Sequence, residues 1–188
     1  MTKLRIGLLA LPFIAAVIAG CETNPVVLGA SKIQGVKEFY LEPVNLDKII
    51  VDDLEEEQFK AQKKPDQIER WEADKNAIKE KFANGFKAIA ARAGISFSDP
   101  SAGHYIIRPT VRMIDTGYYR IPAVDAVTRL HMKIVILDPT GAIVDETAVH
   151  GSESFDMLIA ASTGGRLRDL ADNLGGKYAR YLKKRVAP

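Results

Sequence analysis

Hydrophobic residues recur along the chain with two kinds of spacing, and each predicts a different element. Between residues 66 and 93, steps of three and four place large apolar side chains on one stripe of a long helix. A second such stripe predicts a helix over residues 163–185. Residues 105–115, 127–137 and 143–149 instead alternate between apolar and polar side chains, which is the period of a strand.

The N-terminal part of this pattern is less regular. Residues 36–51 indicate an extended segment that Pro43 interrupts, so they predict a strand with a break or an edge strand. Residues 53–62 favour a short helix, because Asp53 and Glu56 have the spacing of a capping box. Pro65 ends or kinks that helix. Residues 138–141 have the composition of a turn, so the two strands beside them form a hairpin.

The predicted order is therefore strand, helix, three strands, helix (β-α-β-β-β-α). One-sided alternation in the three later strands is typical of an antiparallel sheet with one covered face, and the two long helices would cover it. We predict an α+β fold: a two-layer sandwich with a mostly antiparallel sheet and two helices packed on one face. The expected core includes Ile78, Phe82, Ile89, Met132, Ile134, Leu170 and Leu174.

Glycines interrupt the second long helix at Gly175 and Gly176. Each costs about 1 kcal/mol relative to alanine inside a helix. A close approach of another backbone would offset that cost, so these glycines predict a tight helix contact.

The N-terminus has the organisation of an export signal. Lys3 and Arg5 precede an apolar run over residues 6–19, which is too short for a comfortable transmembrane helix of about 20 apolar residues. The sequence Ile-Ala-Gly-Cys at 18–21 resembles the lipobox of bacterial lipoproteins. That resemblance implies cleavage before Cys21 and lipid on this residue. The alternatives are an uncleaved anchor or an ordinary signal with a coincidental cysteine.

These features divide the chain into a signal peptide (1–20), a lipidated flexible tether (21–35) and a single α+β periplasmic domain (36–188). The resemblance to Gram-negative lipoproteins also concerns location. Glu22 follows Cys21 where aspartate would favour retention in the inner membrane, so we expect the periplasmic face of the outer membrane. The membrane, reached through the lipid on Cys21, is the first expected partner.

Charge and cysteine content exclude several classes of function. The chain has 26 basic and 24 acidic residues, and removal of Lys3 and Arg5 with the leader leaves 26 − 2 = 24 of each. A balanced domain has no bulk attraction to nucleic acid, so no nucleic-acid partner is expected. Cys21 is the only cysteine. Its lipidation would leave no thiol for disulfides, nucleophilic catalysis or cysteine-rich metal sites.

Candidate catalytic residues are sparse. The histidines are His104, His131 and His150, and none has a histidine or glutamate at the spacing of a helical zinc motif. Ser152 lies near His150, but no glycine-flanked serine elbow is present. We therefore expect no enzyme, no metal and no cofactor. Trp71 and Phe82 could form a ligand box, although their helical spacing favours the core.

Two features predict contact with a partner. The first is the loop at 117–125, which is rich in aromatic, aliphatic and basic side chains and either contacts a partner or folds back onto the core. Its candidate residues are Tyr118, Tyr119, Arg120 and Ile121. The second is a basic set on one face of adjacent strands, which either docks an acidic partner or anionic glycan or is merely solvated. It comprises Arg108, Arg112, Arg129, His131 and Lys133, and Asp145 or Glu146 could neutralise it.

The lipobox, the helix that ends near 93–94, the sequence His-Tyr-Ile-Ile-Arg at 104–108, the hairpin at 130–149 and the final helix form one pattern. It resembles small periplasmic α/β lipoproteins of uncharacterised or transport-auxiliary type. The resemblance implies architecture and compartment, with no catalytic residues to carry over. We predict a non-catalytic envelope lipoprotein that acts as a binding or accessory module for a protein partner. The alternative is an auxiliary subunit of a lipid or solute export system that binds a hydrophobic ligand.

Overall fold

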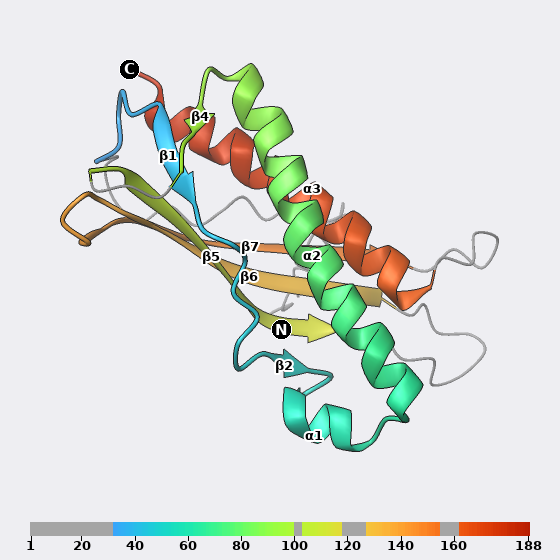
Figure 1. Ribbon diagram of the computed structural model, residues 1–188. Helices are drawn as coiled ribbons and strands as arrows, with labels where there is room; N and C mark the ends of the chain where they lie inside the picture. The colour runs from blue at the N-terminus through green and yellow to red at the C-terminus, as the bar shows by residue number, and fades with distance from the viewer. Residues whose placement is uncertain (1–31, 100–102, 118–126, 155–161) are drawn as a thin grey trace, which may run out of the picture.

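The computed structural model describes residues 32–99, 103–117, 127–154 and 162–188. In these residues two long helices lie side by side over one face of a sheet (Figure 1). The helices are α1 (Glu56–Ala61), α2 (Pro65–Arg92) and α3 (Thr163–Val186). The strands are β1 (Glu38–Leu41), β2 (Ile50–Val51), β3 (Leu54–Glu55), β4 (Ser96–Phe97), β5 (Tyr105–Asp115), β6 (Val127–Leu137) and β7 (Ile143–Ser154).

Strand β5 is the centre of the sheet. Along one edge it pairs in parallel with β1 at its start and with β2 at its end. Along the other edge it pairs antiparallel with β6, which pairs antiparallel with β7. The short strands β4 and β3 extend the sheet beyond β1 and β2, the first in parallel and the second antiparallel. The described sheet is therefore mixed, with three pairings of each kind.

This mixture corrects the prediction of a mostly antiparallel sheet. Helix α2 carries the chain back along the sheet after β3, so β5 starts at the same end as β1 and runs in the same direction (Figure 1). A crossover of this kind produces parallel pairing. The hairpin-linked strands β6 and β7 remain antiparallel, as the turn at 138–141 predicted. The element order also gains the short strands β2, β3 and β4, while the short helix predicted over residues 53–62 is present as α1.

Residues 36–51 form a strand with a break, as predicted. Beyond β1, the backbone N–H of Asn45 donates to Pro109 O at 2.9 Å, and the N–H of Val111 donates to Asn45 O at 2.8 Å. Strand β2 then resumes pairing with the end of β5. The chain thus follows β5 throughout, with Pro43 exposed at the interruption.

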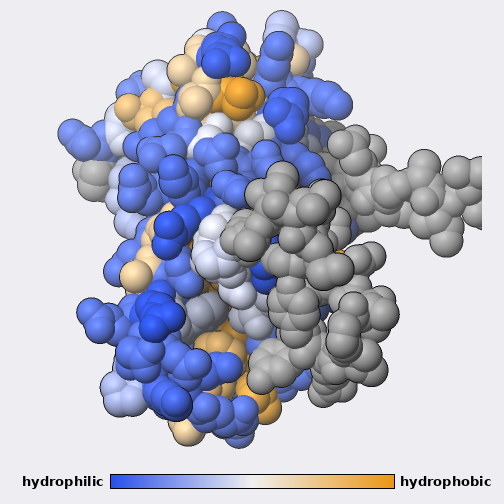
Figure 2. Space-filling view, turned by 90° about the vertical axis from the view of Figure 1, so that its right-hand side faces the viewer, coloured by the Kyte–Doolittle hydropathy of each residue, from blue (hydrophilic) through white to orange (hydrophobic). Residues whose placement is uncertain are grey.

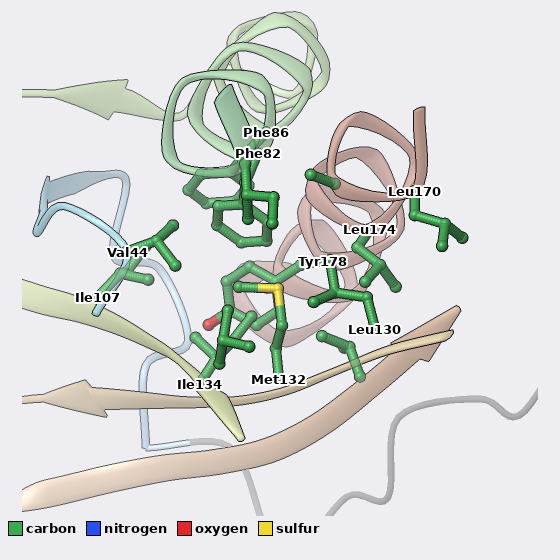
Figure 3. Close-up of a cluster of buried hydrophobic side chains, with 14 of the residues drawn as sticks. Val44, Phe82, Phe86, Ile107, Leu130, Met132, Ile134, Leu170, Leu174 and Tyr178 are labelled. Carbon is green, nitrogen blue, oxygen red and sulfur yellow. The ribbon is translucent and has the colours of Figure 1, made fainter. Parts of the chain in front are cut away.

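The core lies between the helices and the inner face of β5–β7. Figure 3 shows Phe82 and Phe86 of α2 and Tyr178 of α3 above Ile134 of β6, and these four side chains are fully buried or nearly so. The rings of Phe86 and Tyr178 lie 5.2 Å apart. Six of the seven expected core residues are buried, and Ile89 is partly buried. The helix stripes and the alternation of β6 therefore predicted the core correctly.

A β-bulge changes the alternation of β5. Val111 is registered with Met132, but Met113 is registered with His131, so Arg112 is the extra residue. A bulge re-aims the side chains that follow it. Met113, which strict alternation assigned to the side of Val111, faces the outer side of the sheet together with His131.

Helices α2 and α3 approach closely at two glycines. A Cβ on Gly175 would lie 2.3 Å from the carbonyl oxygen of Phe82, and one on Gly85 would lie 2.3 Å from that of Asp172. The predicted close contact is thus confirmed at Gly175. At Gly176 a Cβ would meet only side chains at ordinary distances of 3.6 Å or more.

The boundaries of the domain differ in detail from the sequence pattern. Ile33 is fully buried and the Gly35 N–H donates to Val186 O at 2.9 Å, so these residues of the expected tether lie against the domain. The predicted signal peptide, Cys21 and most of the predicted tether lie outside the described residues. Helix α1 begins after Glu55 rather than at Asp53, which has a left-handed φ of 65°. None of the helices that the structure describes combines the length and hydrophobicity needed to cross a bilayer.

Candidate functional site

An open pocket of about 500 Å³ lies where the start of α2 faces the end of β5 and the start of α3. Figure 2 shows apolar surface low in the view, at the height of α1 in Figure 1, bordered by hydrophilic surface. Both apolar and polar side chains line this pocket. They are Phe59, Lys63, Gln67, Arg70, Trp71, Asp74, Thr116, Gly117 and Thr163.

Two aromatic rings form the apolar wall of the pocket. Phe59 of α1 and Trp71 of α2 lie 5.2 Å apart between ring centroids, at 58°. The Trp71 indole N–H donates to Glu56 Oε1 at 2.9 Å, which fixes the orientation of its ring. The Lys63 ammonium lies 4.3 Å from the centre of the Phe59 ring, a cation–π contact.

A charged network holds α1 against α2 behind this wall. Glu56 accepts from Lys75 at 2.6 Å and pairs with Lys60 at 3.1 Å, while Glu72 pairs with both lysines at 2.8 Å. Burial alone would raise the pKa of Glu56, but the hydrogen bonds from Lys75, Trp71 and Lys60 outweigh it and lower that pKa. The network therefore keeps Glu56 ionised at neutral pH and the Trp71 ring in place.

The opposite wall is built around a buried arginine. Arg166 of α3 is 5% exposed and donates to Thr128 Oγ1 at 2.7 Å, and to Thr116 O and Thr163 Oγ1 at 3.3 Å. Thr116 is held from its other side by Asp52, which accepts from its N–H at 2.7 Å and from its hydroxyl at 2.6 Å. The polar groups of this wall are therefore fixed before any ligand arrives.

Two of the three charged groups that line the pocket are paired. Arg70 forms an ion pair with Asp66 at 2.7 Å, and Asp74 forms one with Arg168 at 3.1 Å. Lys63 takes part in no ion pair within the described ranges. The pocket thus combines the edges of two largely buried rings with a lysine that no carboxylate of the described residues neutralises, which suits a ligand with an apolar part next to an anionic group.

Most charges of the basic set on the sheet are neutralised by acidic side chains, to a greater extent than its sequence pattern indicated. Three of its charges form ion pairs: Arg108 with Glu42, just beyond β1, at 2.5 Å, and, between neighbouring strands, Arg129 with Asp115 at 2.7 Å and Lys133 with Glu146 at 2.8 Å. Arg112 is exposed at the bulge.

The two carboxylates that could have neutralised this set point in opposite directions. Glu146 lies on the outer face and pairs with Lys133, whereas Asp145 faces the helices. Asp145 is 5% exposed, accepts from the Tyr181 hydroxyl at 2.7 Å and pairs with Arg185 at 2.8 Å. Strand alternation explains the difference, since successive side chains face opposite sides.

The histidines separate into one pair and one single residue. His131 and His150 stack on the outer face, with ring centroids 5.5 Å apart. Burial lowers the pKa of His131, and the charges of His150 and Arg129 lower it further. His104 instead lies beside the Ser98 hydroxyl, 2.9 Å from its Nδ1. No group of three or more His, Cys, Asp or Glu residues within the described ranges could hold a metal ion.

The loop predicted to contact a partner lies mostly outside the described residues, which include none of Tyr118, Tyr119, Arg120 and Ile121. Its first residue, Gly117, lines the pocket. Sequence reasoning did not single out Phe59 and Lys63. It assigned Trp71 to the core, which is confirmed because Trp71 is only 6% exposed, and the same residue also lines the pocket. The signal that could have found the pocket is Trp71 itself, the only tryptophan, at the polar start of the α2 stripe.

No protein-family model matches the chain, and no curated protein matches it. Among solved structures it is similar to a minor lipoprotein from Acinetobacter baumannii, at 13% identity and a TM-score of 0.48 over 79% of this chain and 93% of that one. It is also similar to a chain of a PelC dodecamer from Paraburkholderia phytofirmans, at 15% identity and a TM-score of 0.42 over 87% of this chain and 96% of that one. A third similar structure is that of protein XCC0632 from Xanthomonas campestris, at 8% identity and a TM-score of 0.43 over 57% of this chain and 62% of that one.

Proposed function

We propose that this chain is a non-catalytic binding module of the bacterial envelope, anchored by lipid on Cys21 at the periplasmic face of the outer membrane. Its binding site is the pocket between α1, α2, the end of β5 and the start of α3. The observation that carries the proposal is the aromatic wall of Phe59 and Trp71 beside Lys63, which forms no ion pair with any residue that the structure describes.

The size and lining of the pocket support this role. Its volume of about 500 Å³ lies within the range of roughly 300–1,000 Å³ that is usual for binding pockets. Aromatic side chains supply binding energy at interfaces, and a positive charge beside them selects an anionic group. The partner we propose is a protein segment that places an apolar side chain in the pocket and a carboxylate next to Lys63.

The alternative, an auxiliary subunit of an export system with a hydrophobic ligand, would use the same pocket. The interior between the helices and the sheet is filled by side chains such as Phe82, Phe86 and Tyr178 (Figure 3). A hydrophobic ligand would therefore lie against Phe59 and Trp71 rather than between the two layers. Basic residues on the outer face and the loop at 117–125 remain proposed secondary contacts.

Site-specific photo-crosslinking in cells tests the binding site. A crosslinker at Gln67, which is exposed and lines the pocket, should give a discrete adduct with an envelope protein. A crosslinker at Lys81, exposed further along α2, is the matched control. The Lys63→Glu change should abolish the Gln67 adduct, because a carboxylate in the partner would then meet a like charge. An adduct that survives this change, or that forms equally from Lys81, contradicts the proposal.

The anchor is tested separately. Cells labelled with an alkyne analogue of palmitate should transfer the label to the wild-type chain and not to Cys21→Ser. Label retained by the serine variant would show that the anchor is elsewhere. This outcome would leave the pocket itself untouched, so the two parts of the proposal fail independently.

A further inference from the structure

Three side chains from neighbouring strands form a row on the outer face of the sheet. Met113 of β5 is registered with His131 of β6, and His131 is registered with His150 of β7. Residues paired in this way across antiparallel strands face the same side. The next row, which contains Ile114 and Leu130, is fully buried on the inner face, so the Met113 row faces outward.

The row depends on the β-bulge in β5. If Arg112 took a regular strand position instead of forming the bulge, alternation would place Met113 on the side of the buried Val111. The bulge turns Met113 to the outer face, where its backbone register places it opposite His131. Bulges that re-aim a side chain in this way are frequent next to functional sites.

The two imidazoles are close enough to share an ion. Their centroids lie 5.5 Å apart with the planes at 18°, and His150 is exposed while His131 is partly buried. Imidazole nitrogens bind transition metals at about 2.0 Å. Rotation of the rings about their side-chain torsions can bring one nitrogen of each to a common ion, with no movement of the strands. The unbranched side chain of Met113 can follow, because methionine adapts readily to its surroundings.

We propose that Met113, His131 and His150 form a binding site for a monovalent copper ion on the outer face of the sheet. Thioether sulfur is a soft donor that selects Cu(I), while imidazole accepts copper along with zinc and nickel. The sulfur of Met113 therefore supplies the selectivity and the two imidazoles supply most of the affinity.

The surrounding charges are compatible with a monovalent ion. Arg129 and Lys133 lie in the rows on either side of His131, and each is paired with a carboxylate, Asp115 at 2.7 Å and Glu146 at 2.8 Å. The repulsion that these two side chains exert on a bound cation is thereby reduced. A divalent ion would feel about twice the residual repulsion, which favours Cu(I) further.

Competition with a chromogenic Cu(I) chelator, without oxygen, tests the site in the full-length chain held in detergent. A Cys21→Ser background removes the only thiol, which would otherwise compete for copper. This protein should bind one Cu(I) per chain. Met113→Leu should weaken Cu(I) by more than the roughly tenfold that loss of an outer-shell partner costs, and leave weak Zn(II) binding unchanged. His150→Gln should remove both.

His104→Gln is the matched control, because His104 lies beside Ser98 and away from the row. It should bind Cu(I) as the parent does. A parent that binds no Cu(I), Cu(I) affinity unchanged in both Met113→Leu and His150→Gln, or an equal loss in His104→Gln would overturn the site. Thermal melting shows whether each variant is folded. The Met113 methyl resonance, which should shift on addition of Ag(I), reports the same contact in the unmutated sheet.

Discussion

The two faces of the β5–β7 sheet are held by different forces. On the inner face, fully buried Leu130 and Ile134 pack against Phe82 and Tyr178, so stability comes from apolar surface removed from water. On the outer face, ion pairs such as Arg129 with Asp115 cross the strands, with side chains 49% and 33% exposed. Such pairs contribute little and weaken in salt.

This difference separates stability from function along the same strands. Because the inner face determines the fold, the outer face is free to carry groups such as the Met113–His131–His150 row without destabilising the domain. A substitution on the inner face that hardly lowers the free energy of unfolding would contradict this comparison. So would a substitution on the outer face that lowers it strongly.

The largest effect should follow removal of a ring of α2 that packs against the inner face. Phe82 is fully buried between α2 and α3, and Phe82→Ala should lower the free energy of unfolding by about 3–5 kcal/mol, through lost burial and the cavity that remains. Urea unfolding followed by circular dichroism measures it. A loss below about 1 kcal/mol, smaller than one expects for any buried ring, would mean that α2 does not cover the sheet.

A smaller but sharper effect should distinguish two adjacent glycines at the helix contact. A methyl group on Gly175 would collide with the backbone of α2, 2.3 Å from Phe82 O, so Gly175→Ala should cost about 1–3 kcal/mol or more. Gly176→Ala meets only side chains at 3.6 Å or beyond, and should gain up to about 1 kcal/mol from helix propensity. Melting temperatures of the two variants should therefore shift in opposite directions. Shifts in the same direction would contradict the close backbone approach.

The inner face was predictable from the sequence because its signal is periodic. The stripe of α2 and the alternation of β6 identified Phe82, Met132 and Ile134 correctly, since burial on one side imposes a fixed spacing. Regular alternation over residues 105–115 places Met113 on the side of Val111, which is wrong because a single inserted residue, Arg112, reverses the alternation after it, and nothing in the local composition marks a bulge.

The parallel pairing of β5 and the position of the pocket could not be predicted from periodic patterns in the sequence. Whether β5 runs with or against β1 depends on how α2 returns the chain across the sheet, which is a tertiary property. The pocket joins Phe59, Trp71 and Thr163, which are far apart in sequence and share no motif. Sequence could place the buried Trp71 on a helix stripe, but it could not show that a pocket lies beside this end of the stripe, next to α1.

The smallest effect should come from the outer face. Arg129→Ala breaks the 2.7 Å pair with Asp115, yet both side chains are well exposed, so the free energy of unfolding should fall by less than about 1 kcal/mol. The loss should shrink further at high salt, because exposed charges are screened. Asp115→Ala is the matched partner, and a double-mutant cycle isolates the pair from other contacts such as the hydrogen bond from Gly117 N–H to Asp115. A coupling energy above about 2 kcal/mol would exceed any expected for an exposed pair, and would place part of the fold's stability on the outer face.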